Sequence, residues 1–230
     1  MRHRTTISSV ICGALLALAL TALAPANALA QNALRLGPTN TTTYVTFGNP
    51  GSCSGGTNNG VTCTVASQCP GGTCSLSLGL STFTLETWFN RQGTGVGNTT
   101  GSGGITVVPL IAKGAAEADG SVVDANYILG INTAGNVIAA DFEDLATGLN
   151  HPISGTTAIV NSTWYHVAAT YDGSTWNLYL NGNLEATLIV GAFTPRFDST
   201  QLAGLGTMQK SPAAPGALGF FDGTIDEARI

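Results

Sequence analysis

Oxygen-bearing side chains gather in a short stretch of the chain, where Glu117, Asp119, Asp124 and Asn126 lie within ten residues. Glycine and small residues surround them, which is typical of a flexible loop between strands. Calcium takes six to eight hard oxygen ligands from carboxylates, amides and carbonyls, and such a loop can supply them. The stretch therefore predicts a calcium site, although the same acids would also serve to solvate a loop that holds no metal.

A second acidic run, Asp141-Phe142-Glu143-Asp144, follows an apolar segment. Strand alternation sends Asp141 and Glu143 to one face and Phe142 to the other. Two interpretations stay open for this pair of acids. They either line the rim of a ligand groove, as candidate ligand-binding residues, or they are solvated at an exposed strand end.

Hydrolytic chemistry is disfavoured by the spacing of these acids. Glycosidases use two facing carboxylates about 5–9.5 Å apart, and one way to place them is at alternate positions of a single strand. Here Gly120 and Ser121 follow Asp119, and no third carboxylate continues the alternation of Asp141 and Glu143. The chain also contains no Gly-x-Ser-x-Gly sequence, the surrounding of a serine nucleophile in many hydrolases. We therefore expect a protein without catalytic activity.

The three tryptophans are candidates for stacking against sugar rings. Trp88 and Trp164 fall inside alternating segments and are expected in the core. Trp176 comes just after the turn Asp172-Gly173-Ser174 and is predicted to be an exposed ligand-binding platform. His166 is expected to be packed between sheets.

An alternation of apolar and polar residues predicts the strands that must position these side chains. The sequence from Trp164 to Gly173, a second arm starting at Trp176, and the turn Asn181-Gly182 leading into 184–190 predict three consecutive antiparallel strands. Further strands are expected at 83–89, 107–111, 127–131, 137–142, 202–205 and 220–230, and segments 34–36 and 44–47 are expected to form the first strand pair.

Residues 1–30 have the pattern of a secretory signal peptide. Arg2 and Arg4 precede an apolar run at 10–23, and Ala28-Leu29-Ala30 offers a small-residue cleavage site before Gln31. No second apolar stretch is long enough to cross a bilayer. The mature chain, 31–230, is therefore expected to be exported, either secreted or held at the cell surface, without a membrane span of its own.

Four cysteines remain after the signal, Cys53, Cys63, Cys69 and Cys74. An even number in an exported chain indicates disulfides, and their spacing lacks the Cys-x-x-Cys pairs of a zinc site. Three pairings are possible, and the sequence does not choose among them. Segment 51–75 has too little apolar material to form a core, so we expect a stapled insertion at the surface.

The composition of the mature chain excludes some partners. Without Arg2 and Arg4 it has six basic against thirteen acidic residues, a formal charge of −7, which argues against nucleic acid or an anionic membrane as partner. Its abundant glycine, threonine, asparagine and serine are typical of many short strands joined by tight turns, and its length of about 200 residues fits one β-sandwich.

Four motifs in order resemble a known family: 83–89 (Phe-Thr-Leu-Glu-Thr-Trp-Phe), 164–168 (Trp-Tyr-His-Val-Ala), 178–182 (Leu-Tyr-Leu-Asn-Gly) and 221–230 (Phe-Asp-Gly-Thr-Ile-Asp-Glu-Ala-Arg-Ile). Together they resemble the laminin-G-like jellyroll of the concanavalin A-like lectin and glucanase superfamily. The resemblance covers 33–230 with 51–75 as an insertion. It implies an antiparallel β-sandwich, and it implies calcium at the loop that contains Asp124 and Asn126.

The resemblance also implies a role in binding, since members of this family are often binding modules of larger exported proteins. We therefore predict an all-β jellyroll module that recognises an extracellular glycan or a surface protein, with a purely architectural domain as the alternative. Family members usually continue beyond the last motif, so we expect further residues or modules after Ile230.

Overall fold

The computed structural model describes residues 33–37, 43–64, 66–116, 125–211 and 216–230. Regular structure in these residues is β-strand apart from one short 3-10 helix, η1 (Ala66–Gln68). No helix in the described part of the chain is long and apolar enough to span a bilayer. The expected signal peptide, 1–30, lies outside the described residues.

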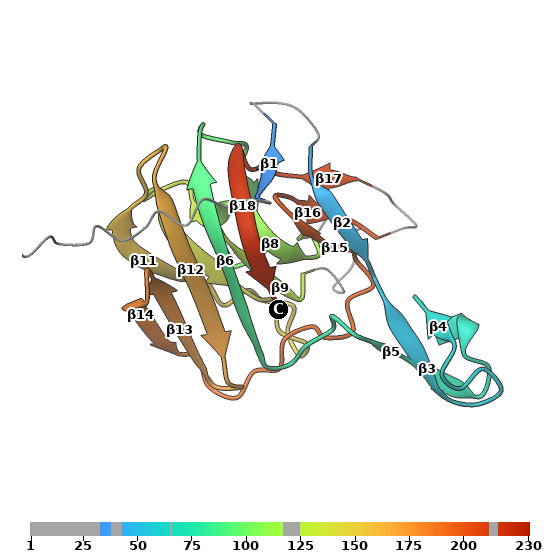
Figure 1. Ribbon diagram of the computed structural model, residues 1–230. Helices are drawn as coiled ribbons and strands as arrows, with labels where there is room; N and C mark the ends of the chain where they lie inside the picture. The colour runs from blue at the N-terminus through green and yellow to red at the C-terminus, as the bar shows by residue number, and fades with distance from the viewer. Residues whose placement is uncertain (1–32, 38–42, 65, 117–124, 212–215) are drawn as a thin grey trace, which may run out of the picture. The chain divides into compact units, whose positions relative to one another are not determined.

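One sheet has six antiparallel strands in the order β1-β18-β6-β12-β13-β14. Their bounds are β1 Leu34–Leu36, β18 Gly223–Arg229, β6 Phe83–Arg91, β12 Trp164–Tyr171, β13 Thr175–Leu180 and β14 Asn183–Ile189. Figure 1 shows β6 between β18 and β12, in the interior of this sheet, so the strand expected at 83–89 is confirmed. The three-strand meander β12-β13-β14 is confirmed too, and its turn uses Asn181 and Gly182 at positive φ of 51° and 78°.

The second sheet has seven strands and follows the order β11-β10-β9-β8-β15-β2, with β7 paired to β8. Their bounds are β2 Val45–Gly48, β7 Asn98–Thr99, β8 Thr106–Lys113, β9 Tyr127–Asn132, β10 Val137–Asp141, β11 Ile153–Ala158 and β15 Ala203–Leu205. A short hairpin of β16 (Met208–Gln209) and β17 (Ala217–Leu218) lies apart from this path.

The expected pairing of the first two segments is wrong. β1 pairs with β18 in one sheet, where Leu34 lies opposite Ile225, whereas β2 pairs with β15 in the other sheet. Two short segments that follow each other in the chain can belong to different sheets when each forms hydrogen bonds with the edge strand of a different sheet. The first two strands therefore connect the layers of the sandwich.

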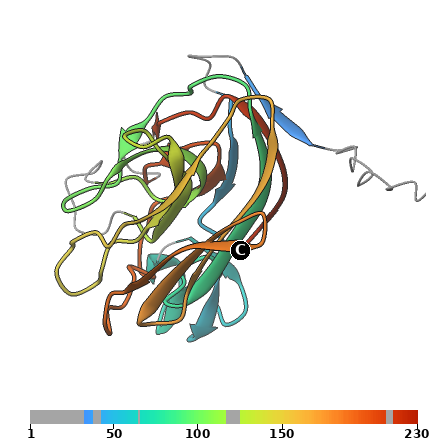
Figure 2. The ribbon, with the colours of Figure 1, turned by 90° about the vertical axis from the view of Figure 1, so that its left-hand side faces the viewer.

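The core lies between the two sheets, which Figure 2 shows as two layers. Alternate residues of β6, namely Phe83, Leu85 and Phe89, turn toward it, and the opposite sheet contributes residues such as Leu129 and Ile138. A second, smaller cluster of mostly valine, isoleucine and alanine side chains buries the other face of the seven-stranded sheet. The seven-stranded sheet is therefore covered on both faces by the chain itself.

Trp176 lies at the centre of this core and is fully buried. Its ring packs 5.5 Å from Phe83 and from Phe142, and 5.4 Å from Tyr171, measured between ring centroids. The predicted exposed platform at this residue is therefore wrong. Trp176 shares its strand face with Leu178 and Leu180, and that alternation decides its burial over the neighbouring turn.

The cysteine-rich insertion forms its own small sheet, β4-β3-β5, beside η1. Its strands are β3 Gly51–Gly55, β4 Thr62–Cys63 and β5 Gly72–Leu76. Disulfides join Cys53 to Cys69 and Cys63 to Cys74, so the predicted bridges are confirmed and one of the three pairings is selected. Two turns of the insertion approach each other closely at Gly56. A Cβ at this position would lie 2.2 Å from the carbonyl oxygen of Pro70, so the close approach requires glycine.

Trp176 is buried and Trp88 is exposed, so replacing each by alanine is expected to lower the free energy of unfolding by different amounts. Trp176→Ala should lower the free energy of unfolding by about 3–5 kcal/mol, because it leaves a large cavity among aromatic rings. Trp88→Ala, on the outer side of β6, should change it by less than about 1 kcal/mol. Urea unfolding followed by circular dichroism measures both values, and equal losses would contradict this assignment of core and surface.

Candidate functional site

The outer face of the six-stranded sheet carries aromatic side chains exposed to solvent. Even-numbered residues of β6 and β12 point away from the core, which leaves Trp88 40% exposed and Trp164 36% exposed. In the strand register, Trp88 lies opposite His166 and Trp164 lies opposite Asn90. The two tryptophans are therefore diagonal neighbours on adjacent strands, about 7–8 Å apart at the backbone, within reach of each other's side chains.

Polar groups lie beside the indole of Trp88. The imidazole of His166 lies 5.2 Å from Trp88 between ring centroids, and its Nε2 lies 3.6 Å from a carboxylate oxygen of Glu86. Tyr179 follows on β13, opposite Ala168 and on the same outer side. We call this group, Trp88, Trp164, His166, Glu86 and Tyr179, the tryptophan face.

Charge on the tryptophan face is partly balanced. Arg229 of β18 donates from Nη1 to Glu86 on the neighbouring strand β6 at 3.0 Å. Asp226 lies opposite Trp88 in the register of β18. Apolar ring faces beside carboxylate and imidazole groups suit a ligand with one apolar side and many hydroxyls, such as a sugar ring.

Three predictions about the aromatic residues of this region are wrong. Trp88 and Trp164 were expected in the core and His166 between the sheets, but all three lie on the outer face. The phase of the alternation was correct, since Trp164, His166 and Thr170 do share one face. The polar residues on that shared face, Glu86 and Thr170 among them, are the sequence signal that would have placed it toward solvent.

The acidic pair Asp141, at the end of β10, and Glu143, just beyond it, is enclosed. Asp141 and Glu143 were expected either to line the rim of a ligand groove or to be solvated at an exposed strand end. Both side chains are buried, which contradicts the solvated strand end and does not support a place at a groove rim. The hydroxyl of Thr100 donates to Oδ2 of Asp141 at 2.5 Å, and Nε of Arg196 lies 3.6 Å from Glu143. The connections that contain Thr100 and Arg196 cover this part of the seven-stranded sheet, which is why the acids do not reach solvent.

Burial controls the protonation of Asp141. It raises the pKa of this carboxyl to about 8, although hydrogen bonds from Thr100 and from the backbone N–H groups of His151 and Phe142 favour the ionised form. Asp141 is therefore mostly protonated at neutral pH. A neutral buried carboxyl acts as part of the internal hydrogen-bond network and not as a groove-lining charge.

The predicted calcium ligands are described only in part, since Glu117, Asp119 and Asp124 lie outside the described residues. The fourth, Asn126, is fully buried. Its Oδ1 accepts from the backbone N–H of Leu80 and its Nδ2 donates to the carbonyl of Leu80, both at 2.8 Å. Asn126 thus ties Leu80 to the start of β9, and calcium at this loop stays a prediction.

The fold and the open aromatic face define a class: a two-sheet antiparallel jellyroll with the architecture of lectins. The family model of the concanavalin A-like lectin/glucanases superfamily, in its laminin-G branch, matches residues 39–230. The chain belongs to this family, as its motifs predicted. No curated protein matches the chain in sequence.

Several solved structures are similar to the chain at low identity. The carbohydrate-binding module CBM40 of Ruminococcus gnavus IT-sialidase, bound to α2,3-sialyllactose, has 16% identity and a TM-score of 0.47, covering 81% of this chain and 88% of that one. The module CBM66 from Bacillus subtilis has 14% identity and a TM-score of 0.37, covering 82% and 94%. Domains LG4-5 of the mouse laminin α1 chain have 9% identity and a TM-score of 0.42, covering 63% and 34%.

The raised pKa of Asp141 predicts a pH-dependent stability. The folded-state value of about 8 exceeds the ordinary 3.8, so the native state binds more protons between these values, and the contribution of Asp141 to stability falls as the pH rises from about 4 to 8. Asp141→Asn has no titratable group at this position, so the variant does not lose stability in this way as the pH rises. The stability of the variant relative to the parent should rise across that range by at most about 1.4 kcal/mol per pH unit.

Urea unfolding at pH 5 and pH 8 measures this difference. Asp172→Asn is a control without pH dependence in this range, because hydrogen bonds from Thr175 and Ser174 lower the pKa of Asp172 from its ordinary 3.8, so this carboxyl is ionised at both pH values. Its deficit relative to the parent should be equal at pH 5 and pH 8 and should shrink only below about pH 4. A difference between Asp141→Asn and the parent that does not change with pH would contradict a protonated buried carboxyl.

Proposed function

We propose that this chain is an exported, non-catalytic binding module that recognises extracellular carbohydrate on its tryptophan face. The observation that carries the proposal is that Trp88 and Trp164, diagonal neighbours on adjacent strands, are both exposed on the outer face of the sheet. Exposed groups of large apolar side chains rimmed by polar residues mark interaction surfaces in soluble proteins. Membership of a superfamily that is named for its lectins agrees with this assignment.

Stacking is the interaction that the face is suited to make. An indole ring offers a flat apolar surface that matches the C–H face of a pyranose, and two diagonal indoles offer this surface twice along one direction. Glu86 can accept hydrogen bonds from sugar hydroxyls while it is held by Arg229 at 3.0 Å. Because the rings sit on a paired sheet and not on a loop, little ordering is required when the ligand binds.

The placement of the carboxylates on this face supports a non-catalytic role. Glu86 is engaged by Arg229 and lies near His166, and Asp226 stands on the neighbouring strand of the same open surface. Glycosidases enclose the scissile bond between two carboxyl groups, one of which is kept protonated by an apolar surrounding. The carboxyl with that property here is Asp141, and it is buried away from any sugar on the tryptophan face.

A protein partner is the second candidate for the same surface. Tryptophan, tyrosine and arginine are the residue types that contribute most to binding energy at protein interfaces, and Trp88, Trp164, Tyr179 and Arg229 lie together here. Carbohydrate is favoured over a protein partner because both indoles lie on a regular strand surface that is open along its length.

A glycan array screened with the oxidised protein tests the proposal. Trp88→Ala and Trp164→Ala should each weaken glycan binding at least about tenfold, equivalent to about 1.4 kcal/mol, because each removes a stacking surface. Ile189→Ala is the matched control, since this side chain is 79% exposed on β14 and lies outside the tryptophan face. It should leave binding unchanged.

The outcomes separate the hypotheses. Binding that persists in the double variant Trp88→Ala/Trp164→Ala would exclude this face as the site. Absence of binding by the parent protein to every glycan would contradict carbohydrate recognition and favour a protein partner. A parallel array with excess chelator tests the calcium prediction, because binding that is lost only on chelation would require a metal.

A further inference from the structure

A pocket of about 290 Å³ opens where the disulfide-bonded insertion meets the chain segment 197–200. We propose that this pocket is a second ligand site, shaped for a single sugar residue that carries no negative charge. The site is separate from the tryptophan face and does not depend on the function proposed for it. Its volume lies at the lower end of the range for small-molecule sites, which suits one ring and not an oligosaccharide.

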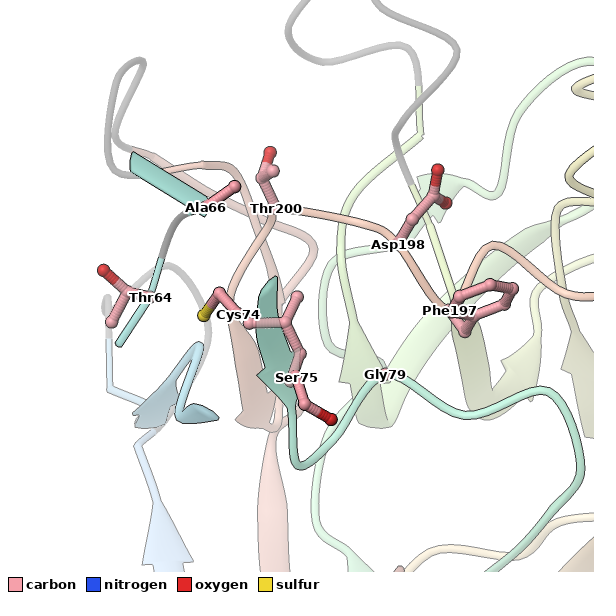
Figure 3. Close-up of a pocket in the computed structure, with 9 residues that line it drawn as sticks. Thr64, Ala66, Cys74, Ser75, Gly79, Phe197, Asp198 and Thr200 are labelled. Carbon is pink, nitrogen blue, oxygen red and sulfur yellow. The ribbon is translucent and has the colours of Figure 1, made fainter. Parts of the chain in front are cut away.

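The two sides of the pocket come from segments far apart in the sequence. Figure 3 shows Phe197 and Asp198 on one side and Cys74 and Ser75 of β5 on the other. The ring of Phe197 is 42% exposed, although it adjoins a buried part of the fold. The insertion therefore does more than extend the chain at the surface, because without it this pocket would lack one wall.

The lining combines the groups that recognise a polyhydroxylated ring. Phe197 offers an apolar ring face, the carboxylate of Asp198 can accept hydrogen bonds, and Ser75, Thr64 and Thr200 bring hydroxyls to the lining. In Figure 3 the hydroxyl of Ser75 points toward Gly79, on the same side as Phe197. An apolar ring together with a few convergent polar groups is the usual composition of a small-ligand site.

Charge at the pocket decides between neutral and acidic sugars. Asp198 is the charged side chain of the lining, and Arg196 lies behind it with Nε 3.4 Å from its carboxylate. The same Nε lies 3.6 Å from Glu143, so one buried guanidinium faces two carboxylates. Lys113 also interacts electrostatically with Asp198. Both cations are buried whereas the side chain of Asp198 is 42% exposed, so the charge that a ligand meets at the pocket is the carboxylate, which disfavours a carboxylated sugar by like-charge repulsion.

Several contacts hold the two walls in place before a ligand arrives. Nδ2 of Asn49 donates at 3.4 Å both to the carbonyl of Thr64 on the insertion and to the carbonyl of Thr200 on the opposite wall. The buried Nζ of Lys113 donates to the carbonyls of Ser199 and Gln201 at 2.9 and 2.7 Å. A preformed site loses less conformational entropy on binding.

Gly79 sets how closely the walls approach. A Cβ at this position would lie 2.0 Å from the carbonyl oxygen of Phe197. Only glycine permits this contact without moving one of the two segments. The pocket therefore depends on a close approach of backbone to backbone as well as on the disulfides of the insertion.

Saturation-transfer NMR with methyl glycosides tests the site in the oxidised full chain. The neutral probes are the methyl glycosides of glucose, galactose, mannose and N-acetylglucosamine, and methyl glucuronide is the charged match of methyl glucoside. At least one neutral probe should receive saturation, and the glucuronide should bind at least about tenfold more weakly than the glucoside. These measurements are made in the double variant Trp88→Ala/Trp164→Ala, which removes sugar stacking on the tryptophan face. In that background Phe197→Ala should weaken binding of the neutral probe at least about tenfold, whereas Ile189→Ala, at an exposed residue outside both surfaces, should leave it unchanged.

Asp198→Asn isolates the charge. This variant should reduce the difference in affinity between methyl glucoside and methyl glucuronide. Glu227→Gln, which changes an exposed acid of β18, should leave that difference in affinity unchanged. If Phe197→Ala fails to fold, chemical-shift mapping on the parent protein replaces it, with the amides of Ser75, Gly79 and Thr200 expected to shift. Absence of saturation for every neutral probe in the Trp88→Ala/Trp164→Ala background, or binding in that background that Phe197→Ala does not weaken, would overturn the proposal.

Discussion

The two-residue period of a β-strand is the constraint on which this molecule depends, and β6 shows it most directly. Its odd residues Phe83, Leu85 and Phe89 are required by the core, so its even residues are forced to the outside whatever their type. Trp88 is therefore exposed because Phe89 is buried. Since β6 lies between β18 and β12, its register also sets which residues stand beside Trp88 on the outer surface.

The seven-stranded sheet differs from the six-stranded sheet because the chain covers both of its faces. The outer cluster consists largely of small side chains such as Ala112, Ala125 and Ala139, which bury little apolar surface. Polar side chains supply the remaining attachments. Lys113 and Asp141 end β8 and β10, two strands that run in the same direction, and each binds a neighbouring segment. Burial lowers the pKa of Lys113 to about 7 while it raises that of Asp141.

Much of the fold was predictable because local sequence patterns determine the strands and turns. Alternation located β6, β8, β9 and β10, and the pair Asn181-Gly182 located a turn whose positive φ angles few residues adopt. The sites were less predictable, since exposure depends on which face another segment covers. Nothing local to Asp141 indicates that Thr100 will lie against it, and nothing local to Phe197 indicates that an insertion more than a hundred residues earlier will form the opposite wall of a pocket.

The two disulfides of the insertion interleave, because Cys63 lies between Cys53 and Cys69 while its partner Cys74 lies beyond them. One peptide-bond cleavage anywhere from Cys53 to Cys74 is therefore bridged by at least one of the two bonds. A protease that nicks this surface segment once produces two chains that stay covalently joined, and only reduction separates them. This disulfide topology therefore lets the insertion tolerate a single cleavage without losing its covalent connection.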